Sequence, residues 1–226
     1  MTTSITILVC YRNEEENILK SGFKIIKSLK KLKIKYRIIF YNDASEDNSE
    51  FIVKKKFKKN CIFFSNNTPK GIGYMFRKVI NIVHTEYFAI MSGNNNYKIS
   101  DYLKIFSKLK YKKDLVVHQI PNNVKSRGLV RSVVSRCFTA IMNLLLKKNI
   151  KYYTGQNLYK TKLLKNFRPK FRYSVIYVEI LIYVLKKLKR ENYLFVKSGF
   201  YKRTKGKTKS INLNNVSEVL KFIWQL

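Results

Sequence analysis

The first 120 residues alternate between short apolar runs and amphipathic stretches, and this alternation limits the available folds more than any other feature. The apolar runs have the length of strands, and the amphipathic stretches carry apolar residues mostly at helical spacing. Strands joined by helices of this length form βαβ units with parallel strands. The pattern predicts an α/β fold with a mostly parallel central sheet flanked by helices. The expected strands are 5–10, 36–41, 61–65, 86–91 and 114–120, and the expected helices are 15–32, 45–57, 71–83 and 99–109.

The second half of the chain is patterned differently. It predicts a long amphipathic helix at 129–148, a strongly apolar helix at 173–188, a strand at 193–203, a basic loop at 204–210 and a final helix at 215–226. We expect core packing for most of the apolar faces of the two long helices. The 226 residues are enough for one sizeable core or at most two small domains, and the 46% of hydrophobic residues fit a packed globular protein rather than a disordered one.

The chain is strongly basic, with 47 Lys and Arg against 13 Asp and Glu, a net charge of +34. Two interpretations stay open. The charge indicates an anionic partner, namely nucleic acid, an anionic membrane surface or a phosphorylated substrate. Alternatively it reflects a composition bias, because the lysines are spread along the whole chain.

Cysteine and histidine are sparse. Cys10, Cys61 and Cys137 are odd in number and far apart, so we expect buried free thiols in a reducing compartment and neither a disulfide framework nor a zinc site. His84 and His118 are too separated for a convincing metal cluster. No window approaches the roughly 20 apolar residues of a membrane span, so we expect a soluble or peripheral protein without a targeting segment.

Polar segments follow the first four predicted strands. They read "YRNEEEN", "NDASED", "NNTPKGIG" and "SGNNNY". Ligands of parallel α/β sheets bind beyond the carboxyl ends of the strands, where these segments converge. The sequence therefore predicts a ligand site at this edge.

Each segment has a plain structural explanation beside a functional one. Asp43 and Asp47 suit hydrogen bonds from a base or ribose while Ser45 caps the following helix, but the same residues also suit a simple capping turn. Glu14 favours a helix N-terminus for dipole reasons alone. The glycines of "PKGIG" allow close backbone approach, although a lone Gly-x-Gly is weak evidence.

Taken in order, the motifs are more specific than any one alone. The chain carries "ILVCYRNEEENI", "NDASED", "NTPKGIGYM", "SRGLVRSVVSRCFTAIMN", "YTGQNLYK" and "RTKGKTKS". This set resembles the inverting glycosyltransferases of the family 2 type with the GT-A fold, which include the polyprenyl-phosphate (dolichol-phosphate) sugar transferases. The resemblance implies a Rossmann-like nucleotide-diphospho-sugar transferase fold in one domain, 1–226. Residues 1–120 would bind the nucleotide sugar and 121–226 the acceptor.

The resemblance also assigns candidate site residues. Asp43 is the best candidate to accept a hydrogen bond from the base ring N–H. Arg131 matches the helix that helps hold the phosphates, with Arg127 assisting, and Arg203 and Lys207 match a late basic motif that meets pyrophosphate or acceptor phosphate. The residues matched to the nucleotide sugar are Asn13, Glu14, Asp43, Ser45, Asp47, Gly71, Gly73, Asn94 and Asn96.

Asn94 stands where the resemblance places the Asp-x-Asp metal motif. Mg²⁺ and Mn²⁺ prefer charged oxygen ligands, and an amide oxygen is a poor anchor. Three interpretations stay open: the nucleotide phosphates supply most metal ligands, Arg and Lys replace the metal, or activity is lost. No organic cofactor is expected.

The leading hypothesis is an enzyme, a hexosyltransferase that moves a sugar from a UDP- or GDP-linked donor with inversion. Glu179 is the only candidate general base in the second half, and a phosphate acceptor needs none. This favours polyprenyl phosphate, or a membrane-associated glycan, at an anionic membrane surface on the cytoplasmic face. The alternatives are a non-catalytic nucleotide-sugar-binding relative and a nucleic-acid-binding protein, the latter disfavoured by the acidic loops.

Overall fold

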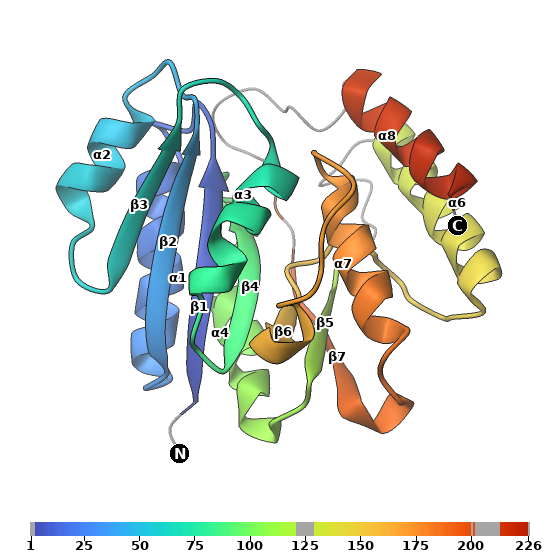
Figure 1. The fold of residues 1–226 in the computed structure, drawn as a ribbon. Helices are drawn as coiled ribbons and strands as arrows, with labels where there is room; N and C mark the ends of the chain where they lie inside the picture. Colours follow the sequence, from blue (N-terminus) through green and yellow to red (C-terminus); the bar gives the residue numbers. More distant parts are fainter. Residues whose placement is uncertain (1–2, 121–128, 200, 202–212, 226) are drawn as a thin grey trace.

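The computed structural model describes residues 3–120, 129–199, 201 and 213–225, and its centre is a seven-stranded sheet (Figure 1). The strand order is β3-β2-β1-β4-β6-β5-β7, so strands from both halves of the chain share one sheet. The strands are β1 (Ser4–Tyr11), β2 (Lys35–Asp43), β3 (Cys61–Asn66), β4 (Tyr87–Ser92), β5 (Leu115–Gln119), β6 (Leu158–Lys160) and β7 (Tyr193–Lys197).

The sheet is mostly parallel, as the alternating pattern predicts. β1 pairs in parallel with β2 and β4, β2 with β3, and β5 with β7. The exception is β6, which lies antiparallel between β4 and β5 and was not predicted. It has three residues, too few to show a period-two pattern. The predicted strand at 193–203 is shorter, because β7 ends at Lys197.

The predicted helices are confirmed, with ends moved by a few residues. The stretches at 71–83 and 99–109 continue as 3₁₀ turns, Ile80–Ile82 and Ser107–Tyr111, after their α-helices. The predicted loop at 204–210 lies outside the described residues. The helices are α1 (Ile18–Lys31), α2 (Ser49–Lys56), α3 (Ile72–Val79), α4 (Ile99–Phe106), α6 (Leu129–Leu146), α7 (Val175–Leu185) and α8 (Leu213–Trp224).

Two apolar layers cover the two faces of the sheet. Successive strand residues point to opposite faces, so Leu8 packs in one layer and Val9 in the other. The first layer contains side chains of α3 and α7, including Phe76 and Ile176. The second layer contains side chains of α1 and α4. The polar loops that follow β1, β2, β3 and β4 lie beyond these two layers, at the carboxyl ends of the strands.

Two expectations about burial are wrong in part. Cys10 is buried, but Cys61 is only partly buried and Cys137 is exposed, because it lies on the outward side of α6. The apolar face of α7 packs in the core, as expected. That of α6 largely does not, because its inward side is formed by a different set of residues that includes Ser132 and Met142. None of the described helices is long and apolar enough to span a membrane.

Candidate functional site

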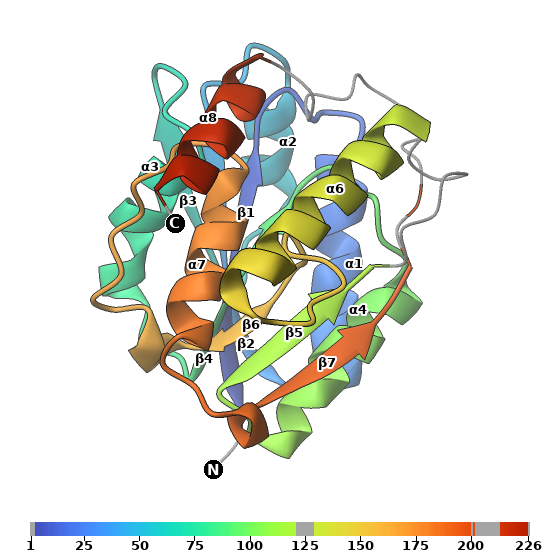
Figure 2. The ribbon, with the colours of Figure 1, turned by 90° about the vertical axis from the view of Figure 1, so that its right-hand side faces the viewer.

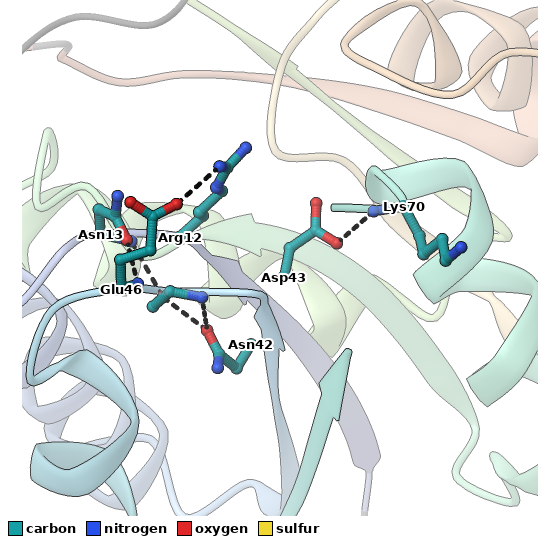
Figure 3. A network of polar contacts seen from close by, with 7 residues as sticks. Arg12, Asn13, Asn42, Asp43, Glu46 and Lys70 are labelled. Carbon is teal, nitrogen blue, oxygen red and sulfur yellow. Dashed lines mark hydrogen bonds and ion pairs between the residues drawn. The ribbon is translucent and has the colours of Figure 1, made fainter. Parts of the chain in front are cut away.

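The loops after β1 and β2 are joined by a network of hydrogen bonds (Figure 3). The backbone N–H of Asn13 donates to Ser45 Oγ at 3.0 Å, and Asn13 Oδ1 accepts from the N–H of Glu46 at 2.8 Å. The N–H of Glu15 donates to Asp47 Oδ2 at 3.0 Å. The predicted convergence of these loops is therefore real, and Asn13, Ser45 and Asp47 are the residues that join them.

Ser45 does not cap a helix, contrary to expectation. The helix α2 begins at Ser49, and Ser45 Oγ instead bonds Asn42 Oδ1. Asp47 is closer to a capping role, since its Oδ1 accepts from the N–H of Ser49 at 3.0 Å. Glu14 is almost fully buried, and its carboxylate accepts from Asn17 Nδ2 at 3.0 Å. Both acidic residues thus shape the loops from within.

Asp43 holds the loop that follows β3. Its Oδ1 accepts from Asn66 Nδ2 at 2.9 Å and from the N–H of Lys70 at 2.8 Å, and its Oδ2 accepts from the N–H of Gly71 at 2.9 Å. A carboxylate offers about four lone-pair positions, so three are used here and about one remains. Its predicted bond to a base N–H stays a prediction, and the remaining position is where it would form.

Each of the four strand-end loops contains one left-handed residue. These are Asn13 (φ 49°), Ala44 (φ 57°), Gly71 (φ 81°) and Asn95 (φ 59°). Gly and Asn adopt this conformation at low cost, whereas a residue such as Ala pays roughly 1–2 kcal/mol. Ala44 therefore stores strain at the turn of "NDASED".

The glycines of "GIG" are explained by close packing against the segment before α7. A Cβ on Gly73 would lie 2.1 Å from the carbonyl oxygen of Phe171, and one on Gly71 would lie 2.5 Å from that of Arg172. The N–H of Gly73 donates to the carbonyl of Arg172 at 3.0 Å. Another backbone segment thus approaches these glycines, and their predicted contact with the ribose and sugar stays a prediction.

Arg172 and Glu218 belong to this arrangement and were missed in the sequence. The Arg172 guanidinium donates to the carbonyl of Lys70 at 2.7 Å and also to that of Pro69. The carboxylate of Glu218, on α8, accepts from the N–H groups of Arg172 and Tyr173 at 2.8 and 2.9 Å. Neither residue sits in a periodic or motif position, so only the tertiary contacts reveal them. The contacts link α8 to the loop that Asp43 holds.

The loop after β4 presents two amide oxygens with no partner. The Oδ1 atoms of Asn94 and Asn96 are buried and make no hydrogen bond within the part of the chain that the structure describes. The loop is held from α1 by Lys24, whose Nζ donates to Asn95 Oδ1 at 2.8 Å and to the carbonyl of Tyr97 at 3.1 Å. Burial, with the nearby Lys20, lowers the pKa of Lys24.

A buried oxygen without a partner is costly, and a cation or a ligand donor would satisfy it. Amide oxygens fit a divalent cation weakly, because such ions prefer carboxylates. Among the described residues, no group of three or more His, Cys, Asp or Glu is placed to hold a metal ion. The predicted metal residue Asn94 therefore offers one neutral ligand, and the charged ligands would have to come from a bound diphosphate.

A hollow of about 390 Å³ opens beside the Asp43 loop. This volume falls within the range of small-molecule sites. A smaller hollow of about 130 Å³ lies within the loop after β1. The larger one is lined by Asn42, Ala44, Ser45, Glu46, Glu50, Ser65, Asn66, Asn67 and Pro69.

Most of the predicted catalytic cations lie outside the residues that the structure describes. Arg127, Arg203 and Lys207 fall outside the described residues. Arg131 belongs to the first turns of α6, and only its backbone is described. The candidate base Glu179 is occupied, since its carboxylate accepts from the N–H groups of Lys170 and Phe171 at 2.8 and 3.3 Å. Burial raises its pKa.

The seven-stranded, mostly parallel sheet flanked by helices has the GT-A fold of glycosyltransferases. The sequence matches the model of glycosyl transferase family 2 over residues 6–167, and the chain belongs to this family. It is therefore a glycosyltransferase, and the GT-A fold is confirmed. A search of curated proteins finds no match.

Two solved structures illustrate the likeness in fold. Mannosyl-3-phosphoglycerate synthase from Rubrobacter xylanophilus superposes with a TM-score of 0.76 at 12% identity, covering 99% of this chain and 73% of its own. Glucosyl-3-phosphoglycerate synthase from Mycobacterium tuberculosis, in complex with Mn²⁺, UDP-glucose and phosphoglyceric acid, superposes with a TM-score of 0.71 at 16% identity. The match covers 98% of this chain and 77% of that one.

Proposed function

We propose that this glycosyltransferase moves a sugar from a UDP- or GDP-linked donor to a polyprenyl phosphate, with inversion at the anomeric carbon, on the cytoplasmic face of an anionic membrane. The observation that carries the proposal is the meeting of four polar strand-end loops at one sheet edge in a family 2 chain. Residues 1–120 bind the donor and 121–226 the acceptor. The hollow beside Asp43 has the size of a nucleoside site.

Residues 1–120, which bind the nucleotide sugar, supply hydrogen-bond acceptors to it. The spare lone pair of Asp43 accepts from the base ring N–H, and the Asn94 and Asn96 oxygens, buried without a partner among the described residues, are acceptors for donor groups of the sugar. The negative charge that grows on the leaving diphosphate is balanced by Arg131 and Arg127, with Arg203 and Lys207. Asn94 Oδ1 would be the protein's ligand for Mg²⁺ or Mn²⁺, which would supply positive charge at the leaving group.

An anionic acceptor suits this chain because an anionic oxygen needs no general base to remove a proton. The acceptor oxygen attacks opposite the leaving diphosphate, and a hydroxyl there would require a group that removes its proton. Glu179 is held by two backbone N–H groups and is occupied. The two solved structures are named for phosphoglycerate, an anion that carries a hydroxyl as well as its phosphate. The exposed apolar surface of the acceptor half supports a lipid-linked phosphate instead.

A transfer assay tests the proposal directly. A panel of UDP- and GDP-sugars is combined with a short-chain polyprenyl phosphate or with 3-phosphoglycerate, each with Mg²⁺, Mn²⁺ or EDTA. We expect transfer to the polyprenyl phosphate, lost in Arg131→Ala and retained in Arg136→Ala on the same helix. Transfer to 3-phosphoglycerate and not to the polyprenyl phosphate would contradict polyprenyl phosphate as the acceptor.

A non-catalytic nucleotide-sugar-binding protein is the second candidate, and the amides at Asn94 and Asn96 favour it. Donor binding without turnover in every arm of the assay would establish it. The metal ligand is tested separately by titrating Mn²⁺ into the chain without donor. Asn94→Asp should tighten this binding, and tight binding by the parent would contradict a weakened metal site.

A further inference from the structure

The outward side of α6 is an almost unbroken apolar surface. Its large exposed side chains are Leu129, Val133, Val134, Ile141, Leu144 and Leu145. At about 100° per residue these side chains fall within an arc of about 160°. Leu144 is 80% exposed and Leu129 67% exposed, so the described part of the chain leaves them open to solvent. We call these six residues the α6 apolar face.

This face points outward because the opposite side of α6 is anchored. Met142 is fully buried, and Phe138 and Leu146 pack against the same core layer. Asn143 exchanges hydrogen bonds with the backbone of Ile150, and its Oδ1 also accepts from Tyr153 at 2.8 Å. Rotating α6 to hide its apolar face would break these contacts.

The helix α8 lies on the same side of the molecule as α6 and carries two more exposed apolar side chains. Figure 2 shows α6 and α8 both turned toward the viewer, in front of α7. Leu220 is 64% exposed, and Trp224, at the end of α8, is 92% exposed. Phe222 between them is buried against Phe171 and holds α8 in place. Trp is a residue that favours the membrane interface.

The charged residues of α6 and of the segment directly after it are all positive. Arg136, Lys147 and Lys148 are exposed on α6 or directly after it, and residues 129–151 contain no Asp or Glu. The acidic residue of α8, Glu218, is bonded to the backbone of Arg172 and Tyr173. An apolar centre with cationic borders is the pattern of a helix that lies in a membrane interface.

From this arrangement we infer that the α6 apolar face, with Leu220 and Trp224, docks onto the surface of an anionic lipid bilayer. A second copy of the chain fits less well, because two chains of net charge +34 repel each other, while anionic lipids attract both the cations and the apolar centre. No described helix could span a membrane, so the contact lies at the surface.

Docking of this kind would bring the acceptor half to the lipid. Through Glu218 and Arg172, α8 is joined to the loop that Asp43 holds. The benefit for catalysis rests on the proposed function, since a lipid-linked acceptor lies in the same surface. The docking itself does not depend on it and is measured without donor or acceptor.

The test is vesicle binding by the full chain. Sedimentation is measured with phosphatidylcholine vesicles and with vesicles that also contain phosphatidylglycerol. The chain has one tryptophan, so the emission of Trp224 reports directly on this surface. We expect binding to the anionic vesicles and a blue shift of the emission.

Variants then separate the face from the bulk charge. Leu129→Gln combined with Leu144→Gln should weaken binding at least about tenfold, since each Leu loses its apolar burial. Phe51→Gln, at an apolar position of α2 that is 63% exposed, is the matched control and should bind like the parent. Thermal unfolding verifies that all variants are folded.

Three results would overturn the inference. One is absence of binding to anionic vesicles. Another is binding by the double variant that equals the parent, with an unshifted Trp224 emission, which would assign binding to charge alone. The third is a parent chain that does not bind vesicles but forms a dimer in light scattering, when the double variant is a monomer. That result would make the α6 apolar face an interface between copies.

Discussion

Replacing Asp43 by Asn separates the structural role of this carboxylate from its proposed role toward the nucleotide. The carboxylate accepts three hydrogen bonds, from Asn66 Nδ2 and from the N–H groups of Lys70 and Gly71. An amide has one oxygen, so in either orientation its NH₂ group must face at least one of these donors. Asp43→Asn therefore loses at least one bond and places two donors against each other.

The size of the effect follows from that loss. A hydrogen bond to a charged group contributes about 1.5–3 kcal/mol, and we expect the free energy of unfolding to fall by about this amount. For a chain of this length, 1 kcal/mol corresponds to about 2–4 °C, so the melting temperature should fall by about 3–12 °C. The measurement is thermal unfolding without ligand. Titration with UDP and GDP should show weakened binding in the same variant.

Glu46→Gln is the matched control. Glu46 lies in the same loop, and its side chain is 79% exposed and pairs with Arg12 at 3.3 Å. Exposed pairs contribute about 0–1 kcal/mol, so its melting temperature should change little. A stability of Asp43→Asn within about 0.5 kcal/mol of the parent would refute the bonding described here. Lost nucleotide binding with unchanged stability would make Asp43 a ligand residue only.

Three further predictions test the fold around the site. Ala44→Gly should stabilise the protein by about 0.5–1 kcal/mol, because relief of the left-handed strain exceeds the entropy cost of Gly; a lower melting temperature would contradict this. Gly73→Ala should destabilise the protein by about 1–3 kcal/mol, because the added Cβ meets the Phe171 carbonyl. Helix propensity alone predicts a gain of about 1 kcal/mol, so a stabilised variant in thermal unfolding would contradict the close packing at Gly73. Burial lowers the pKa of His118 to about 3 from an ordinary 6.5. The contribution of the neutral side chain to stability should therefore be full above pH 6.5 and fall by up to about 1.4 kcal/mol per pH unit toward pH 3. Denaturant titrations of His118→Gln should show a flatter dependence of stability on acid pH, and an unchanged dependence would refute this role of His118.

The sequence alone predicted the sheet and the convergence of polar loops at one of its edges. Continuous apolar runs such as 5–10 are typical of parallel strands that are buried on both faces, and helical spacing between them leaves few other folds. The ordered motifs then indicated the family, which the match over residues 6–167 confirms. These features are local in the chain, so they can be recognised without knowledge of what packs against what.

Other features depended on contacts between distant residues. The short antiparallel β6 has too few residues to show a period, and it forms by pairing with β4 on one side and β5 on the other. Gly73 was interpreted as a residue that approaches a ligand, yet the nearest group to its missing Cβ is the backbone of Phe171, almost a hundred residues later. Arg172 was not singled out at all, because a lone arginine in a basic chain has no pattern.

The amphipathic helix α6 shows the same division. Its apolar periodicity was visible in the sequence, and periodicity states that one side of a helix avoids water. It does not state what covers that side. Only the tertiary structure shows that Ser132 and Met142 face the core while Leu144 faces out, because the direction of a helix is set by its packing partners. The sequence determined that α6 has an apolar side, and the packing decided that this side is exposed in the part of the chain that the structure describes.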